Sequence, residues 1–290
     1  MNLEEYFRRI NFNSPYETPD LATLKLIHRH HVMAIPFENL SIHCGERITM
    51  DLECIFNKIV RSNRGGWCCE NNFLFAWVLK ELGYNPVTLG SRVFNSIIHD
   101  FNPTDSHLIN KVVIEGNTYI ADVSFGVSCQ LWEPLELVSG KNQAQAVGVF
   151  RLIENGEDWI LEKTGRKPVI LNPDFANSSL IEKKQTKAIY CFSLVPRGID
   201  HFLETSHKLQ TDPTSLFTNK SICSLQTASG FRALIGWTYS EVTFKPEEGV
   251  DLLEMRDIPD NELEQTLREK FRVKLVNKLV AINNKASYTL

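Results

Sequence analysis

The stretch RGGWCCENNFLFAWVLKEL, residues 64–82, combines two glycines, two cysteines and an apolar pattern that predicts a helix. Leu74, Trp77 and Leu82 have the spacing of one helical face, and Gly83 is a typical stop after the last turn. The two glycines precede the helix, so the sequence places Cys68 at or near its N-terminus.

A thiol at a helix N-terminus can become a nucleophile. The pKa of a free cysteine, about 8.5, falls at a helix N-terminus or beside an imidazolium, and the thiolate is the reactive form. A lone cysteine is also commonly a small buried apolar residue. Cys68 alone therefore leaves a catalytic and a packing interpretation open.

The preceding part of the chain has helical periodicity. Apolar residues recur at spacings of three and four in residues 3–10 and 52–60, and Thr18 before Pro19 is typical of a helix start. Between them, AIPFENLSIHCGERI at 34–48 contains a proline and a glycine, which predicts a packed loop. We expect residues 1–84 to form a helical bundle that carries Cys68.

The pattern changes to short β-rich runs after residue 85. PVTLGSRVF, HLINKVVI, NTYIADVSF and AIYCFSLV are separated by turn-forming residues, which predicts an antiparallel sheet curled into a barrel over 85–192. Residues 163–188 are polar and basic, so we expect an inserted surface loop there. Residues 193–290 mix strands with a helix from about Pro259 to Phe271 and form an α/β lid, so the fold class is α+β.

His107 and Asp122 are candidates for a base and its orienting carboxylate. A hairpin turn at Glu115–Gly116 puts Asp122 diagonal to His107 on one face, within reach of its side chain. A turn at Gly116–Asn117 separates the two residues by four positions. The sequence leaves both registers open, and the first permits a cysteine-protease-like Cys-His-Asp triad.

Composition and charge limit the classes of partner that we expect the chain to bind. The formal net charge is -4 and the pI is about 6.1, so no general field attracts nucleic acid or anionic membranes. No apolar run reaches the roughly 20 residues that span a bilayer, and the N-terminus does not resemble a secretory signal. We expect no nucleic-acid or membrane partner, and nothing demands an oligomer, so we expect a monomer.

Seven scattered cysteines favour free thiols in a reducing compartment, which predicts a cytoplasmic protein. His28 and His31 share a helical face, but no CxxC or HExxH pattern supplies further ligands, so we expect no metal. No Walker or GxGxxG loop is present to hold phosphates.

Four features together resemble the arylamine N-acetyltransferases, and most of all their vertebrate branch. They are RGGWC at 64–68, IPFENL at 35–40, SLQT at 224–227, and a histidine that begins one strand while an aspartate closes its partner. The resemblance covers essentially the whole chain. It implies a helical bundle, a β-barrel and an α/β lid, in agreement with the order of elements expected above.

The resemblance also implies the chemistry. It predicts transfer of acetyl from acetyl-CoA to arylamines and arylhydrazines, with O-acetylation of N-hydroxyarylamines, by a ping-pong mechanism through acetyl-Cys68. The implied catalytic residues are Cys68, His107 and Asp122. The implied acceptor-binding residues are Phe37, Val93, Phe125, Val127 and Cys129. The implied CoA-binding residues are Ser106, Lys208, Thr214 and Ser287.

Two other readings use the same residues. A thiol hydrolase or transglutaminase needs the same triad with water or a protein amine as acceptor, and a silent homologue binds CoA or a partner without an adduct. Glu38 and Arg64, one from each motif, are expected to form a buried pair that braces the nucleophile loop.

Overall fold

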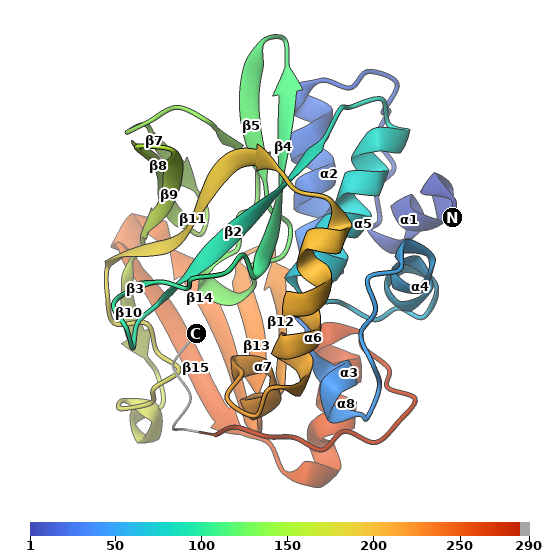
Figure 1. The fold of residues 1–290 in the computed structure, drawn as a ribbon. Helices are drawn as coiled ribbons and strands as arrows, with labels where there is room; N and C mark the ends of the chain where they lie inside the picture. Colours follow the sequence, from blue (N-terminus) through green and yellow to red (C-terminus); the bar gives the residue numbers. More distant parts are fainter. Residues whose placement is uncertain (285–290) are drawn as a thin grey trace.

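The computed structural model describes residues 1–284, which form short helices and two β-sheets (Figure 1). The α-helices are α1 (Leu3–Arg9), α2 (Leu21–Ala34), α3 (Leu40–His43), α4 (Leu52–Phe56), α5 (Cys68–Glu81), α6 (Leu203–Thr211), α7 (Leu216–Asn219) and α8 (Leu263–Phe271). The strands are β1 (Phe37–Glu38), β2 (Val87–Asn95), β3 (Asp100–Phe101), β4 (His107–Ile114), β5 (Asn117–Ala121), β6 (Leu135–Glu136), β7 (Asn142–Gln145), β8 (Gly148–Asn155), β9 (Asp158–Thr164), β10 (Lys167–Ile170), β11 (Thr186–Pro196), β12 (Ile222–Thr227), β13 (Gly230–Ile235), β14 (Thr238–Lys245) and β15 (Val250–Asp257).

The N-terminal helices begin at polar caps and bury their apolar faces. Asn2 caps α1, where its Oδ1 accepts a hydrogen bond from the Glu4 amide at 2.7 Å. The start of α2 differs from the expectation, because Asp20, not Thr18, caps it by accepting from the Thr23 amide at 2.7 Å. Side chains of these helices, of α5 and of the barrel then form one continuous apolar core.

The β-rich region forms a strongly curled antiparallel sheet. The strand order is β6-β5-β4-β2-β11-β9-β8-β7, with β3 paired to β2. In the β4–β5 hairpin Ile114 is the partner of Asn117, and both Glu115 (φ 50°) and Gly116 (φ 81°) have left-handed backbones. These are the angles of a two-residue hairpin turn, so the first of the two expected registers is confirmed.

Glutamine side chains hold the two edges of this sheet together, so that the barrel is nearly closed. Gln143 of β7 accepts from the backbone amide of Glu136 in β6 at 2.9 Å and donates to its carbonyl at 2.9 Å. Gln145 bonds in the same way to the backbone of residues 132 and 133. The expected β-barrel is therefore present. Glutamine side chains join its two edge strands, β6 and β7, in place of backbone hydrogen bonds between them.

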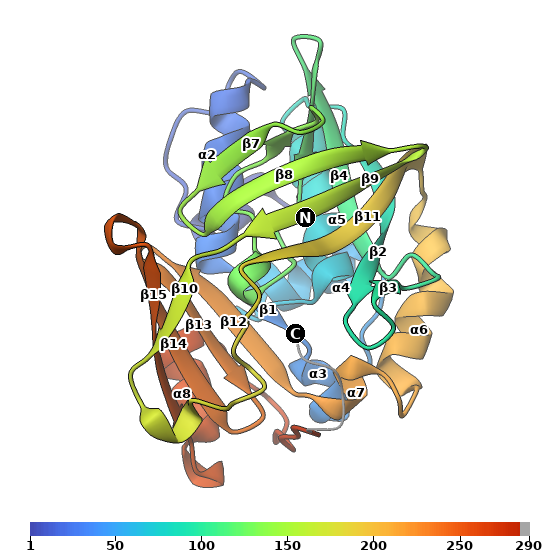
Figure 2. The same cartoon turned by 90° about the vertical axis from the view of Figure 1, so that its left-hand side faces the viewer.

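The second sheet, of order β1-β12-β13-β14-β15-β10, lies below the barrel in the view of Figure 2. Helix α8 packs on it through Leu263, Leu267 and Phe271, the three residues whose spacing predicted that helix. The sheet combines β1 from the helical region, β10 from within 163–188 and β12–β15 from the C-terminal region. The expectation of a surface loop at 163–188 is thus wrong for Lys167–Ile170, which pairs in parallel with β15.

Candidate active site

The two motifs of the sequence lie side by side. The Glu38 amide donates to the Gly66 carbonyl at 3.0 Å, and the Gly66 amide donates to the Pro36 carbonyl at 3.2 Å. A Cβ atom on Gly65 would lie 2.2 Å from the Pro36 oxygen, so only glycine allows the backbones to come this close. This pairing fixes the direction in which the chain enters α5.

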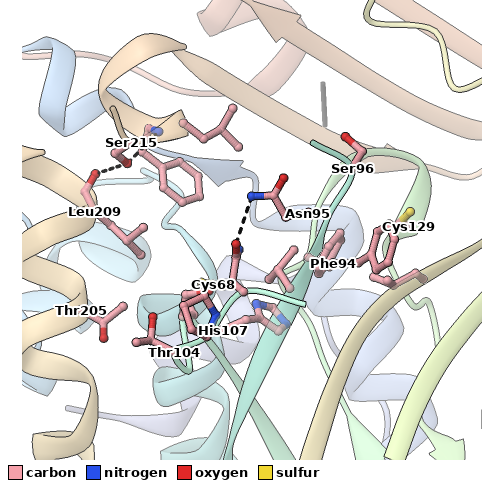
Figure 3. A pocket seen from close by; sticks show the side chains of 18 of the residues that line it. Cys68, Phe94, Asn95, Ser96, Thr104, His107, Cys129, Thr205, Leu209 and Ser215 are labelled. Carbon is pink, nitrogen blue, oxygen red and sulfur yellow. Dashed lines mark hydrogen bonds between the residues drawn. The ribbon is translucent and has the colours of Figure 1, made fainter. Parts of the chain in front are cut away.

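Cys68 is the first residue of α5 and is buried at the edge of a pocket (Figure 3). Its Sγ lies 3.6 Å from the Ser106 carbonyl oxygen and 3.9 Å from the Cys69 Sγ. The Glu70 carboxylate accepts from the Trp67 amide at 3.2 Å and so anchors the turn before the cysteine. The predicted position of Cys68 at a helix N-terminus is confirmed.

His107 and Asp122 form a buried pair beside Cys68. The His107 Nε2 lies 2.7 Å from the Asp122 Oδ2, and the His107 side chain also interacts with the Cys68 thiol. Burial lowers the pKa of His107, but the charge and hydrogen bond of Asp122 outweigh it and raise this pKa to about 10. The imidazole is therefore cationic at neutral pH while Asp122 is ionised.

The Asp122 carboxylate is held by groups that the sequence did not reveal. Its Oδ1 accepts from the Asn72 side chain at 2.9 Å and from the Ser124 amide at 3.0 Å. Burial raises the pKa of Asp122, whereas His107 and these hydrogen bonds lower it below its usual value. Asn72 lies four residues after Cys68, on the same helical face, and that spacing is the signal by which it could have been found.

His28 supports the same segment from α2. Its Nε2 accepts from the Asp122 backbone amide at 3.2 Å, and its Nδ1 lies 3.0 Å from the Trp132 carbonyl. Burial lowers the pKa of His28 to about 4, so the ring is neutral. Its nitrogens are occupied by the backbone, which explains this histidine without a metal.

Opposing influences act on the Cys68 thiol. The hydrogen bond with Cys69 and burial raise the pKa of Cys68 well above its usual value, and the hydrogen bond and charge of His107 offset only part of this rise. The N-terminus of α5 also favours the thiolate through its backbone dipoles. Ionisation of Cys68 therefore depends on a cationic His107.

Arg64 and Glu38 form the buried pair expected from the sequence. The Arg64 Nε donates to Glu38 Oε1 at 2.9 Å, and its Nη2 donates to Glu38 Oε2 at 3.2 Å. Glu38 also accepts from the backbone amides of Leu40 and Gly65 at 2.8 and 3.2 Å. One carboxylate thus ties the PFENL segment to the nucleophile loop.

Replacement of Arg64 or Glu38 by alanine is expected to lower the free energy of unfolding by about 3–5 kcal/mol, because each change leaves the partner's charge buried without its bidentate counter-charge. Without Glu38, Arg64 retains only Glu46 as an ion-pair partner within residues 1–284, at 3.3 Å. The double variant is expected to be no less stable than either single variant. Urea denaturation of the three variants measures this coupling. Additive losses in the double variant would show that the two residues act independently.

A cavity of about 550 Å³ opens beside Cys68 and His107. The five residues expected to bind the acceptor all line it, and so do three of those expected to bind CoA: Phe37, Val93, Phe125, Val127 and Cys129, with Ser106, Lys208 and Thr214. Ser287 lies outside the described residues. Phe125 packs edge-on against the His107 ring, with ring centroids 5.2 Å apart. The predicted residues therefore surround one pocket, while their roles stay predictions.

Two of the expected CoA contacts, Lys208 and Thr214, line this cavity and are exposed to solvent. Lys208 pairs with Glu204 at 2.6 Å, and Thr214 donates to Asp212 at 2.7 Å. Glu204 and Asp212 are both exposed to solvent. Lys208 can therefore exchange the Glu204 carboxylate for a phosphate at a small cost in free energy.

The pocket also contains charged residues that the sequence analysis missed. Glu182, Lys184 and Lys187 line its wall, and Lys187 interacts with the Cys129 thiol. They lie in the segment expected to be a surface loop, so nothing in their local sequence pointed to the pocket. Only the return of the chain into β11 places them there.

Within residues 1–284, no group of three or more His, Cys, Asp or Glu side chains is arranged to hold a metal. In the same range, no helix is both long and apolar enough to cross a membrane.

Comparisons with known proteins give a consistent result. A family model described as N-acetyltransferase matches residues 20–280. The chain is 53% identical over 290 residues to a pineal gland arylamine N-acetyltransferase of Gallus gallus and 44% identical over 290 residues to arylamine N-acetyltransferase 2 of Mus musculus, covering 100% of each chain. The structure of Mycobacterium marinum arylamine N-acetyltransferase in complex with CoA is similar with a TM-score of 0.77 and 26% identity, over 94% of this chain and 93% of that one.

Proposed function

This chain belongs to the arylamine N-acetyltransferase family and is an acyltransferase, and we propose that it transfers acetyl from acetyl-CoA to aromatic amines, arylhydrazines and N-hydroxyarylamines through an acetyl-Cys68 intermediate. One observation carries the mechanism. The Cys68 thiol, at the start of a helix, meets a His107 imidazole that is 2.7 Å from a buried carboxylate, at the edge of a cavity.

The first half-reaction acetylates Cys68. The Cys68 thiolate attacks the thioester carbonyl of acetyl-CoA, and we expect backbone amides at the start of α5 to stabilise the oxyanion. The carbon–sulfur bond to CoA then breaks, and the departing sulfur takes the proton from the His107 imidazolium. The products are CoA and a neutral acetyl-enzyme.

The second half-reaction regenerates the enzyme. Because the Cys68 thiolate is one of the groups that raise the pKa of His107, acetylation of that sulfur lowers this pKa and makes the imidazole a better base. The amine nitrogen attacks the acetyl carbon, His107 accepts the nitrogen's proton, and the Cys68 sulfur leaves as a thiolate. Asp122 keeps the ring oriented throughout.

The known relatives support CoA as the carrier, since a solved relative is described in complex with CoA. Lys208 and Thr214, exposed in the pocket wall, suit the phosphates and polar groups of such a ligand. Phe37 and Phe125 present aromatic faces and edges suited to an aromatic acceptor. All seven cysteines are free thiols, which fits the cytoplasm, and we propose that the enzyme works there as a monomer.

Mass spectrometry of the intact protein with acetyl-CoA tests the proposal against a thiol hydrolase. The transferase gains one acetyl group that persists until an arylamine is added. An adduct that decays at the same rate without amine identifies a hydrolase, and no adduct identifies a silent homologue. Either result rejects the ping-pong transferase.

Mild peroxide is expected to inactivate the enzyme by oxidising Cys68, and prior acetylation by acetyl-CoA is expected to protect it. Peroxide oxidises the thiolate form of cysteine, and the sulfur of an acetyl thioester is a much weaker nucleophile than a thiolate. Residual activity after timed peroxide exposure, with and without acetyl-CoA, measures the protection. Equal loss under both conditions would mean that Cys68 is not the target.

A further inference from the structure

The turn at residues 126–128 has a backbone conformation that is unfavourable for its central residue, Val127. The φ angle of Val127 is 42°, in the left-handed region, and that of Gly126 before it is 85°. A positive φ is an outlier for a β-branched residue, because the left-handed conformation brings Cβ close to the following carbonyl oxygen. Contacts with other parts of the fold must therefore hold Val127 in this conformation.

Two side chains of the SLQT segment, residues 224–227, bind both backbone groups of Val127. The Val127 amide donates to Ser224 Oγ at 3.2 Å, and the Val127 carbonyl accepts from Gln226 Nε2 at 3.0 Å. Ser224 and Gln226 are two residues apart in β12, so their side chains project from the same face of the strand. Together they fix the peptide groups on both sides of the Val127 Cα atom.

The Gln226 carboxamide is itself held in one orientation. Its Oε1 accepts from the Trp132 indole nitrogen at 2.8 Å. Because an indole nitrogen can only donate, the Gln226 oxygen must face Trp132 and the amide nitrogen must face Val127. Ser224 and Gln226 are 1% and 3% exposed, so water has little access to compete for their hydrogen bonds.

Side chains of other elements hold the residues on either side of Val127. The Gly126 amide donates to Gln130 Oε1 at 3.0 Å, and the Ser128 carbonyl accepts from the Lys163 ammonium group. These two contacts fix the ends of the turn and leave the amide and carbonyl of Val127 to the SLQT segment.

The residue held in this way forms part of the catalytic pocket. Val127 lines the cavity that also contains Cys68, and its side chain packs against buried apolar residues of β13 and β14. Ser224 is the register partner of Phe37, a second residue of the same pocket wall. Within residues 1–284, Ser224 and Gln226 are not among the residues that line the cavity, so they act on it through the turn that they hold.

We propose that Ser224 and Gln226 are positioning residues for the transfer of acetyl to the amine, because they hold Val127 in its left-handed conformation and so fix the wall against which the acceptor binds. The inference rests on the proposed function and gives the SLQT segment a role in the second half-reaction. Without these hydrogen bonds Val127 relaxes toward a negative φ, which turns its side chain. The acceptor then meets a less ordered wall, and fewer encounters place its nitrogen against acetyl-Cys68.

Ser224→Ala tests the proposal by removing one hydroxyl group, and the two half-reactions are measured separately in each sample. The burst of CoA released without amine gives the rate of acetylation, and its amplitude counts the folded active sites. The acetyl-enzyme, separated from CoA by rapid gel filtration, is then mixed with 4-methylaniline. Ser224→Ala is expected to lower the second-order rate constant with this amine about 5-fold or more, as for the loss of one neutral hydrogen bond, and to leave acetylation within about 2-fold of the parent.

Thr227→Val is the matched control, because it removes a hydroxyl group from the same segment at little change in shape. Thr227 ends β12, and within residues 1–284 its side chain neither bonds Val127 nor lines the pocket. This variant is expected to keep both rates.

A second comparison uses Val127→Gly. Glycine has no side chain to position and adopts a positive φ without strain. In a protein that carries Val127→Gly, the further change Ser224→Ala is therefore expected to alter the second half-reaction by less than about 2-fold. A loss of the same size with valine and with glycine at position 127 overturns the proposal, because Ser224 then acts independently of Val127.

Two other results also overturn the proposal. Equal losses in both half-reactions mean that the SLQT segment supports the whole site, and an unchanged second half-reaction means that the wall does not depend on Ser224. If the parent protein forms no acetyl-Cys68, the proposed function fails and this inference fails with it. An acetyl-enzyme that reacts with the amine equally fast in the parent and in Ser224→Ala rejects this inference alone.

Discussion

Cys68→Ala is expected to lower kcat/KM for arylamine acetylation by about four orders of magnitude or more and to abolish the acetyl-enzyme. The other thiols cannot replace Cys68. The adjacent Cys69 is buried. Among the interactions of residues 1–284, the His107 imidazole that lowers the pKa of Cys68 contacts the sulfur of Cys68 and of no other cysteine. Steady-state rates and the intact mass after incubation with acetyl-CoA measure the two effects.

Cys54→Ala is the matched control, because Cys54 is the exposed cysteine among the seven. It is expected to keep the parental rate and the acetyl adduct. Since Cys68 is buried in a packed turn, melting temperatures of both variants show whether the alanine has disturbed the fold. An acetyl adduct of normal yield in Cys68→Ala would place the nucleophile elsewhere.

Local sequence was sufficient to predict the helix that carries the nucleophile. Its apolar spacing, the preceding glycines and the final Gly83 are all signals within one short segment, and α5 begins at Cys68 as expected. The pairing of RGGWC with PFENL could not be predicted in this way, because it depends on a contact between two separate segments. The sequence shows that Gly65 is present, but only the approach of the Pro36 carbonyl explains why a larger residue is excluded.

The register of the β4–β5 hairpin shows a limit of pattern analysis. The two candidate turns shift the partner of each residue by two positions, and side chains alternate with period two, so both registers bury the same face. Hydrophobic pattern therefore cannot choose between them. The structure adopts the register in which Asp122 reaches His107, with Glu115 in a left-handed conformation that is uncommon for a residue with a side chain.

Long-range pairing explains the largest error of the sequence interpretation. Strand β10 has four residues, is polar at its start and lies at the edge of its sheet, so it has no alternation long enough to identify. Its partner β15 is some eighty residues further along the chain. The same limitation hid the contact between Lys163 and Lys187, because the two lysines become neighbours only when β9 and β11 bring them opposite each other.

Asp122→Asn is expected to lower kcat for acetyl transfer by about three to four orders of magnitude while leaving the fold intact. The amide has nearly the shape of the carboxylate, but it carries no charge to stabilise the His107 imidazolium. Asp122 is the strongest influence that raises the pKa of His107 to about 10, against the opposing effect of burial. With asparagine at this position, the pKa of His107 falls, the imidazole is neutral at neutral pH, and the Cys68 thiol keeps its proton.

The pH dependence of Cys68 alkylation by iodoacetamide distinguishes this loss of charge from a loss of structure. In the parent protein His107 stays protonated until the pH rises through about 10. We expect this imidazolium to supply enough Cys68 thiolate for alkylation at neutral pH, against the burial and the Cys69 contact that raise the pKa of the thiol. In Asp122→Asn the imidazolium is lost at lower pH, and alkylation is expected to require a pH near or above the ordinary thiol pKa of about 8.5. Asn72 still faces residue 122 and helps to hold the side chain in place, so the position of Cys68 is expected to be unchanged. An unchanged alkylation profile with a rate of acetyl transfer within about 10-fold of the parent would mean that Asp122 positions the backbone and does not set the charge of His107.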